Sequence, residues 1–200
     1  MNGFLLSGGR SERFGSDRAQ AVLDGRTLFA RAAETLARAV GPHGDVHAVG
    51  PGQARRADVR LRWLEDAPDV PPGPLGGLIT AVRAGGGLVL ACDMPCVPAS
   101  TLQVLPFLGG AERPAAPRVR GRILPLCAWW PAGSAPALAA AMRQDAGSLS
   151  AAFERAGGVG ISLQELGVRP EDEWLFTRVR TPYDLTELEG LVQARGGLWS

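Results

Sequence analysis

A glycine-rich and arginine-rich stretch near the start of the chain carries the strongest chemical signal. Residues 6–18 read Leu-Ser-Gly-Gly-Arg-Ser-Glu-Arg-Phe-Gly-Ser-Asp-Arg and directly follow a short apolar run. Glycines such as Gly8 and Gly9 let backbone N–H groups approach a ligand closely, and several such groups form a nest for phosphate oxygens. Arg13 and Arg18 add cations to the same loop, so the pattern predicts a polyphosphate site. The alternative is a surface turn with solvated arginines, because glycine-rich turns are common.

The spacing in this loop excludes two well-known phosphate motifs. It is neither Gly-x-Gly-x-x-Gly nor a loop that ends in Gly-Lys-Ser/Thr. Hydride transfer with a dinucleotide and P-loop ATP hydrolysis therefore lose their support.

A second candidate is Asp93, which follows the apolar run 87–92. Open α/β sheets bind ligands at the carboxyl ends of their strands, where this carboxylate is expected to lie. One or two carboxylates are enough to hold Mg²⁺ when phosphate oxygens complete its coordination. The alternative is an aspartate that caps the next turn or helix.

Backbone amides recur in the segment Gly73-Pro-Leu-Gly-Gly77, just before a predicted helix. Free N–H groups at a helix start favour an anionic ligand. A plain helix start after a proline-rich loop is the alternative. Asp66, a little upstream, is a further candidate or else a solvated loop residue.

Arginines recur at every second position in two later segments. Arg118, Arg120 and Arg122 would share one face of a strand, and Arg178 and Arg180 repeat the spacing. Such a face would bind an anionic acceptor. Charged edge strands that resist unwanted pairing are the alternative.

The remaining reactive side chains suggest no nucleophile. The three cysteines, Cys92, Cys96 and Cys127, lack zinc spacing and cannot all pair. They are expected to be small buried hydrophobes in a reducing compartment. We assign no role to His43 or His47.

Short apolar runs alternate with helical patterns, which predicts an α/β fold with a mostly parallel sheet. No linker divides the chain, so residues 1–200 are predicted to form a single domain. Expected strands are 4–6, 46–49, 61–64, 87–92, 118–122 with a turn, 123–130, 159–163 and 175–179. Expected helices are 28–40, 75–83, 100–108 with Ser100 as its cap, 136–143, 148–155 and 181–192 with proline at its first position.

Composition narrows the class of partner. Lys plus Arg is 21 against 20 acidic residues, and all 21 cations are arginine. A net charge of +1 leaves no global field for nucleic acid or an anionic membrane, so neither is expected as a partner. No apolar run reaches membrane-spanning length, and the first residues do not resemble a signal peptide. A cytoplasmic protein is expected.

Taken in order, these motifs resemble the molybdenum cofactor guanylyltransferases. The first loop is similar to the family's Leu-Ala-Gly-Gly-x-Ser-x-Arg-Met-Gly-x-Asp-Lys. Further matches are Leu64-Glu-Asp66, Gly73-Pro-Leu-Gly-Gly-Leu78, Ala91-Cys-Asp-Met-Pro95 and Thr181-Pro-Tyr-Asp-Leu185. Together they cover nearly the whole chain.

The resemblance implies a Rossmann-like three-layer α/β/α nucleotidyltransferase domain that transfers GMP from GTP to the phosphate of molybdopterin and releases pyrophosphate. It implies Mg²⁺ as cofactor, bound by Asp93, and it allows molybdoenzymes or other cofactor-biosynthesis proteins as partners. The implied catalytic residues are Arg13, Arg18 and Asp93. The implied nucleotide contacts are Leu6, Ser7, Gly8, Gly9, Arg18, Asp66, Gly73, Pro74, Leu75 and Asp93, with residues 73–77 beside the guanine. The implied acceptor contacts are Arg178 and Arg180.

Three departures from the family pattern stand out. Arg18 replaces the family's lysine, which keeps the charge but not its compact shape. Arg178-Val-Arg180 replaces Asn-x-Asn on the side associated with molybdopterin. No asparagine stands near Val49.

These departures leave two alternatives open. One is a CTP-dependent or other nucleotidyltransferase that acts on a phosphorylated acceptor. The other is a nucleotide-binding protein without activity.

Overall fold

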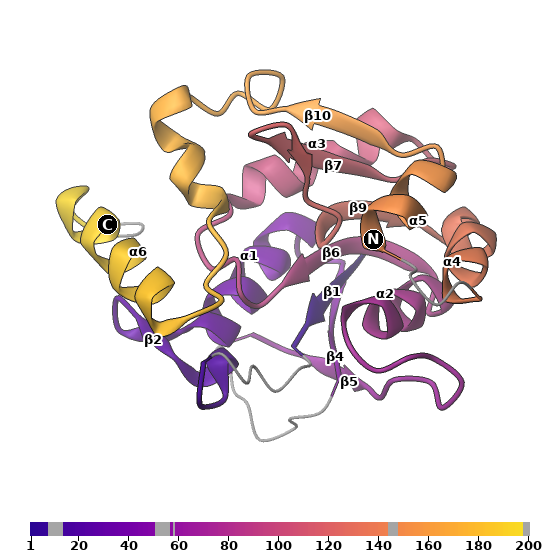
Figure 1. The fold of residues 1–200 in the computed structure, drawn as a ribbon, viewed down its shortest axis with the longest axis horizontal. Coiled ribbons are helices and arrows are strands. Elements are labelled where there is room, and N and C mark those ends of the chain that lie inside the picture. Colours follow the sequence, from indigo (N-terminus) through magenta and orange to yellow (C-terminus); the bar gives the residue numbers. More distant parts are fainter. Residues whose placement is uncertain (8–13, 51–56, 58, 144–147, 198–200) are drawn as a thin grey trace.

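A central β-sheet organises the computed structural model, which describes residues 1–7, 14–50, 57, 59–143 and 148–197. Its strands follow the order β10-β7-β9-β6-β1-β4-β5, with β8 paired to β7 (Figure 1). They are β1 (Asn2–Leu6), β4 (Asp45–Val49), β5 (Arg62–Leu64), β6 (Gly86–Ala91), β7 (Ala115–Val119), β8 (Arg122–Ile123), β9 (Cys127–Pro131) and β10 (Val159–Ser162). A separate hairpin joins β2 (Val22–Leu23) to β3 (Arg26–Thr27).

The sheet is mostly parallel, as the sequence predicts. Strand β1 runs parallel to both β4 and β6, β5 runs parallel to β4, and β10 runs parallel to β7. Strand β9 is the exception, since it lies antiparallel between β6 and β7.

Helices cover both faces of the sheet and produce three layers. They are α1 (Leu28–Val40), α2 (Pro74–Arg83), α3 (Ala99–Gly109), α4 (Ala135–Met142), α5 (Leu149–Arg155) and α6 (Pro182–Ala194), with 3₁₀ turns η1 (Arg18–Gln20), η2 (Ala132–Ser134) and η3 (Pro170–Phe176). Helices α1 and α3 share one apolar core, and α2, α4 and α5 share the core on the opposite face. Residues of β6 alternate between these cores, which explains why the strand is apolar without alternation.

A third, smaller core joins the two ends of the chain. Side chains of the β2–β3 hairpin region pack against α6 and Val179, with Leu23, Leu28 and Cys96 fully buried among them. Figure 1 shows α6 (yellow) lying beside the β2 region (indigo). This core positions the segment before α6 at the same end of the sheet as the first loop.

The predicted strand at 175–179 is wrong. Residues 170–176 form η3 instead, opened by Pro170 with three acidic residues in its first turn. The segment that follows is extended, but the bond from the Val179 N–H to the Asp93 carbonyl ties it to a loop and not to a strand.

The predicted one-sided arginine strand at 118–122 is also wrong. Arg120 and Gly121 have φ values of 48° and 75° and form a two-residue turn between β7 and β8. Positive φ at both central positions matches the twist of a tight hairpin. The side chain of Arg120 forms an ion pair with Glu173. The expected strand 123–130 is divided into β8 and β9.

The cap of α3 differs as well. The helix begins at Ala99 after Pro98, and no side chain caps it. Ser100 therefore lies within the first turn and does not cap the helix. The predicted helix at 28–40 is confirmed at both ends, and Pro182 opens α6 as expected.

Candidate active site

A cavity of about 340 Å³ lies at the carboxyl ends of β1 and β6. The strand order changes direction here, because β4 continues from one side of β1 and β6 from the other. Open α/β sheets bind ligands at such a switch point. The cavity is lined by residues that come from both halves of the chain, including Leu6, Arg18, Asp66, Gly73, Asp93 and Arg178.

Asp93 is the buried centre of this cavity, with only 1% of its side chain exposed. The neighbouring N–H of Cys92 donates to the Leu6 carbonyl at 3.1 Å, and the N–H of Met94 turns back to the Ala91 carbonyl. The carboxylate is therefore held just beyond β6, where the sequence predicts it. A buried carboxylate needs a charged partner, since an unpaired one is strongly destabilising.

Arg178 supplies the main partner. Its Nη2 donates to Asp93 Oδ2 at 2.8 Å and its Nε to Oδ1 at 3.3 Å. This two-point geometry is specific to arginine and a carboxylate. Sequence reasoning assigned Arg178 to an acceptor site and missed this pair, because no local pattern connects residues 85 positions apart.

Arg18 is the second partner, from the opposite end of the chain. Its Nη2 lies 3.3 Å from Asp93 Oδ2, and 17% of its side chain is exposed. It begins η1, which the side chain of Asp17 caps by accepting from the Ala19 N–H. The Nε of Arg18 is buried and has no hydrogen-bond partner among the described residues.

Helix α2 contributes its N-terminus to the cavity wall. Gly73 precedes the helix with φ of 101°, which favours glycine, and no side chain caps it. Uncapped N–H groups of a first turn attract anions. Pro74 lines the cavity, whereas Leu75 packs into the α2 core.

Asp66 follows β5 and faces the same cavity. Its Oδ1 accepts from the Thr80 hydroxyl at 3.5 Å. A Cβ on Gly77 would come within 3.8 Å of that oxygen, so the glycine leaves space beside the carboxylate.

The predicted amide cradle of the first loop lies largely outside the described residues, as do Gly8, Gly9 and Arg13. The part that is described is already bonded within the sheet. Both the N–H and the hydroxyl of Ser7 donate to the Val49 carbonyl, at 3.0 and 3.1 Å. Arg180 is exposed, and its backbone N–H donates to Asp184.

The cysteines are buried, as the sequence predicts. Burial raises the pKa of Cys96 to about 12, although nearby Arg31 works to lower it. Burial also raises the pKa of Cys127. These two thiols stay protonated near neutral pH and are not nucleophiles.

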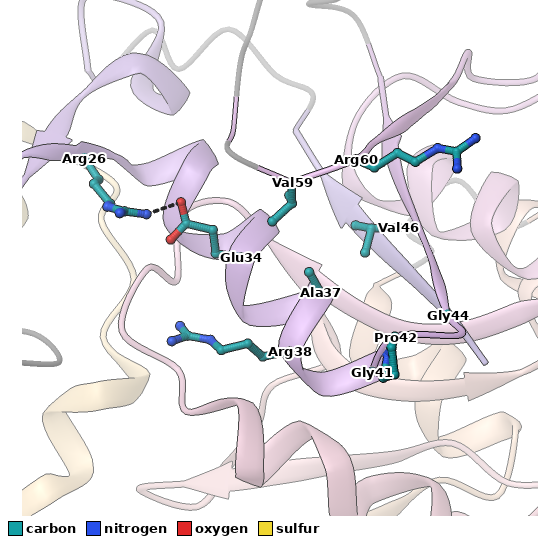
Figure 2. Close-up of a pocket in the computed structure, with 10 residues that line it drawn as sticks. All are labelled: Arg26, Glu34, Ala37, Arg38, Gly41, Pro42, Gly44, Val46, Val59 and Arg60. Carbon is teal, nitrogen blue, oxygen red and sulfur yellow. Dashed lines mark hydrogen bonds and ion pairs between the residues drawn. The ribbon is translucent and has the colours of Figure 1, made fainter.

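A larger hollow of about 730 Å³ lies elsewhere, over α1 and β4. Its floor is apolar, and Figure 2 shows Arg26 and Glu34 pointing toward each other at its rim. This ion pair engages Glu34, which is the one carboxylate among the described residues that line the hollow. Among the described residues, none that the motifs single out lines this hollow, whereas Leu6, Arg18, Asp66, Gly73 and Asp93 line the smaller cavity.

The donor set around Asp93 fits a magnesium ion carried mainly by substrate phosphates. Asp93 and Asp66 offer hard oxygen atoms, which Mg²⁺ prefers. In the part of the chain that the structure describes, no three His, Cys, Asp or Glu side chains gather to form a protein cage for a metal.

Solved structures define the class to which this fold belongs. It is similar to molybdopterin-guanine dinucleotide biosynthesis protein A from Archaeoglobus fulgidus, with a TM-score of 0.79 and 22% identity, over 97% of this chain and 100% of that one. A nucleotidyl transferase from Methanothermobacter shares the fold with a TM-score of 0.68 and 16% identity, over 97% and 98%. The architecture is thus the α/β fold of nucleotidyltransferases.

The sequence identifies the family. Residues 3–159 match the model of the MobA-like NTP transferase domain, so the chain belongs to this family of nucleotidyltransferases. A protein of Cereibacter sphaeroides named molybdenum cofactor guanylyltransferase is 30% identical over 96% of each chain. One of the same name from Acidiphilium cryptum is 34% identical over 69% of this chain and 70% of its own.

No helix in the described part of the chain is both long and apolar enough to span a bilayer.

Proposed function

We propose that this protein transfers GMP from GTP to the terminal phosphate of molybdopterin and releases pyrophosphate. The observation that carries the proposal is the meeting of Asp93, Arg18, Arg178 and the uncapped start of α2 in one cavity. Relatives named for this reaction support the choice of donor and acceptor.

In this proposal the triphosphate lies against the cationic wall. Arg18 donates from its free Nε to a phosphate oxygen, and the N–H groups after Gly73 bind at the α2 terminus. Asp93 would hold a magnesium ion, and that ion when bound would neutralise phosphate charge. The acceptor phosphate attacks the α-phosphorus in line, and the bond to the leaving pyrophosphate breaks. The protein's own contribution is positioning and charge compensation, as is general for phosphoryl chemistry.

Arg178 and Arg180 remain proposed acceptor contacts. The Arg178 side chain is 35% exposed and lines the cavity beside Asp93, so we place it between the proposed triphosphate site and the proposed acceptor site. Arg180 lies in the open just before α6.

The test is pyrophosphate release from GTP and molybdopterin, with and without Mg²⁺, in wild type and Arg18→Lys. We expect turnover that needs both substrates and the metal, and Arg18→Lys within about tenfold of wild type because the charge is retained. CTP and ATP serve as competing donors. Preference for CTP would favour a cytidylyltransferase, whose fold is shared by the Thermus thermophilus 2-C-methyl-D-erythritol 4-phosphate cytidylyltransferase at 16% identity and a TM-score of 0.63. Tight GTP binding without turnover would favour a nucleotide-binding protein that lacks activity.

A further inference from the structure

Arginine side chains contact both oxygens of the Asp93 carboxylate. Arg178 contacts both of its oxygens, and Arg18 contacts Oδ2 as well. A divalent cation at the same oxygens would lie within a few ångströms of the guanidinium of Arg178, and like charges at that distance repel strongly in a partly buried site. Metal and Arg178 therefore compete for one carboxylate.

Separate contacts hold the backbone beside Arg178, whereas its side chain is held through Asp93. The adjacent Val179 is fully buried in the third core, and its N–H donates to the Asp93 carbonyl at 2.8 Å. Beyond Val179, the N–H groups of Arg180 and Thr181 donate to the side chain of Asp184. The side chain of Arg178, by contrast, is 35% exposed at the cavity wall, so it has room to rotate about a fixed base.

An exchange of partners keeps every buried charge compensated. Among the lining residues that the structure describes, Arg18 and Arg178 balance Asp66 and Asp93. If a metal ion enters with a triphosphate, Asp93 exchanges the Arg178 guanidinium for the metal ion as its partner. Arg178 then exchanges the Asp93 carboxylate for a phosphate group. If the metal enters alone, the guanidinium released from Asp93 has no phosphate to bind.

We propose that Arg178 is a positioning residue that excludes divalent cations from Asp93 until a nucleotide phosphate binds its guanidinium. This inference rests on the proposed function. Metal and nucleotide binding are then coupled through one arginine, and by thermodynamic linkage each favours the other equally.

The test measures Mn²⁺ binding to nucleotide-free protein by the electron paramagnetic resonance of free Mn²⁺. Wild type is compared with Arg178→Gln and Arg178→Lys. We expect Arg178→Gln to bind Mn²⁺ at least about tenfold more tightly than wild type, because the competing charge is gone. Arg178→Lys should fall between them, since an ammonium keeps the charge but cannot hold both oxygens.

Two controls locate the effect. Arg122→Gln removes the same charge from an exposed position on β8 outside the cavity and should match wild type. Adding Asp93→Asn to Arg178→Gln should abolish the gain. Equal Mn²⁺ affinity in wild type and Arg178→Gln would overturn the proposal, as would an unchanged gain in the double variant. If circular dichroism shows that Arg178→Gln does not fold, the comparison of Mn²⁺ affinity between Arg178→Lys and wild type takes its place. Equal affinities in these two proteins would then overturn the proposal.

A nucleotide titration separates this inference from the proposed function. In EDTA, GTP should bind Arg178→Gln about tenfold more weakly than wild type, because a phosphate partner is lost. Absence of GTP binding in every variant, with Mg²⁺ present as well as in EDTA, would refute the proposed function. The Mn²⁺ affinities measured without nucleotide would still test the role of Arg178 separately.

Discussion

Asp93 is held by arginines from two regions that are built differently. Arg18 belongs to the amino-terminal half, where it begins the 3₁₀ turn η1 and where β1, β4 and β5 pair as parallel strands of the central sheet. Arg178 belongs to residues 177–181, which join no sheet and are positioned by Val179, Asp93 and the start of α6. The first region has a regular scaffold, whereas the second depends on a few tertiary contacts. The Asp93 carboxylate nevertheless makes its closer ion pair with the second region, at 2.8 Å to Arg178 against 3.3 Å to Arg18.

The largest expected effect comes from removing the group that joins the two regions. Asp93→Asn should lower pyrophosphate release at least about 10²-fold, because a neutral amide neither compensates the two guanidinium groups nor holds a metal well. The matched control is Asp69→Asn, an exposed aspartate that Arg83 holds in a similar fork at 2.8 and 3.0 Å. Near-normal turnover in Asp93→Asn would refute its assigned role.

The regular region should be most sensitive at Gly76. A Cβ there would lie 2.0 Å from the backbone oxygen of Pro71, which cannot move without displacing the loop before α2. Gly76→Ala is expected to cost about 1–3 kcal/mol in urea unfolding. Gly77→Ala is the control, since its Cβ would come no closer than 3.4 Å to Leu6, and its stability should be equal or higher.

The irregular region should be sensitive at its apolar anchor. Val179→Ala removes two methyl groups from a fully buried position and should lower the free energy of unfolding by about 1–3 kcal/mol. GTP affinity should fall as well, because the backbone of Arg178 is no longer held in place by the buried side chain of Val179. Loss of stability with unchanged GTP affinity would show that the anchor does not position Arg178.

The two arginines should respond unequally to lysine. Arg178→Lys forfeits a two-point contact and should cost about 1–2 kcal/mol in thermal or urea unfolding. Arg18→Lys gives up a single contact at 3.3 Å and should cost less than about 1 kcal/mol. Equal costs would remove the distinction between the two regions.

The smallest effect is expected at the start of α6. Partial burial raises the pKa of Asp184, but hydrogen bonds from the N–H groups of Arg180 and Thr181 outweigh it, so the pKa lies below its usual value of 3.8. A lowered pKa in the folded state means that Asp184 stabilises the protein above that value and that this contribution is lost as the pH falls through the folded pKa. Asp184→Asn should cost about 0.3–1 kcal/mol at neutral pH and almost nothing at pH values below the folded pKa.

Local patterns predicted most of the regular half. Leu28–Val40 was recognisable from its apolar stripe, and the wholly apolar 87–92 indicated a central strand with Asp93 at its end. These predictions succeed because the periodicity of a helix or a strand is visible in residues that are close together in the sequence. The same reasoning failed at 175–179 and at Arg120, where a 3₁₀ turn and a two-residue hairpin replaced a strand.

The sequence by itself determined the α/β architecture, the family motifs and the candidate residues Arg18, Asp66 and Asp93. The tertiary structure alone decided that Arg178 bonds to Asp93. That pairing is set by a buried valine, one backbone hydrogen bond and a helix cap far from Asp93 in the chain, none of which leaves a periodic signal near either residue. A buried carboxylate requires a compensating charge, and which of the 21 arginines provides it is decided only when the chain is folded.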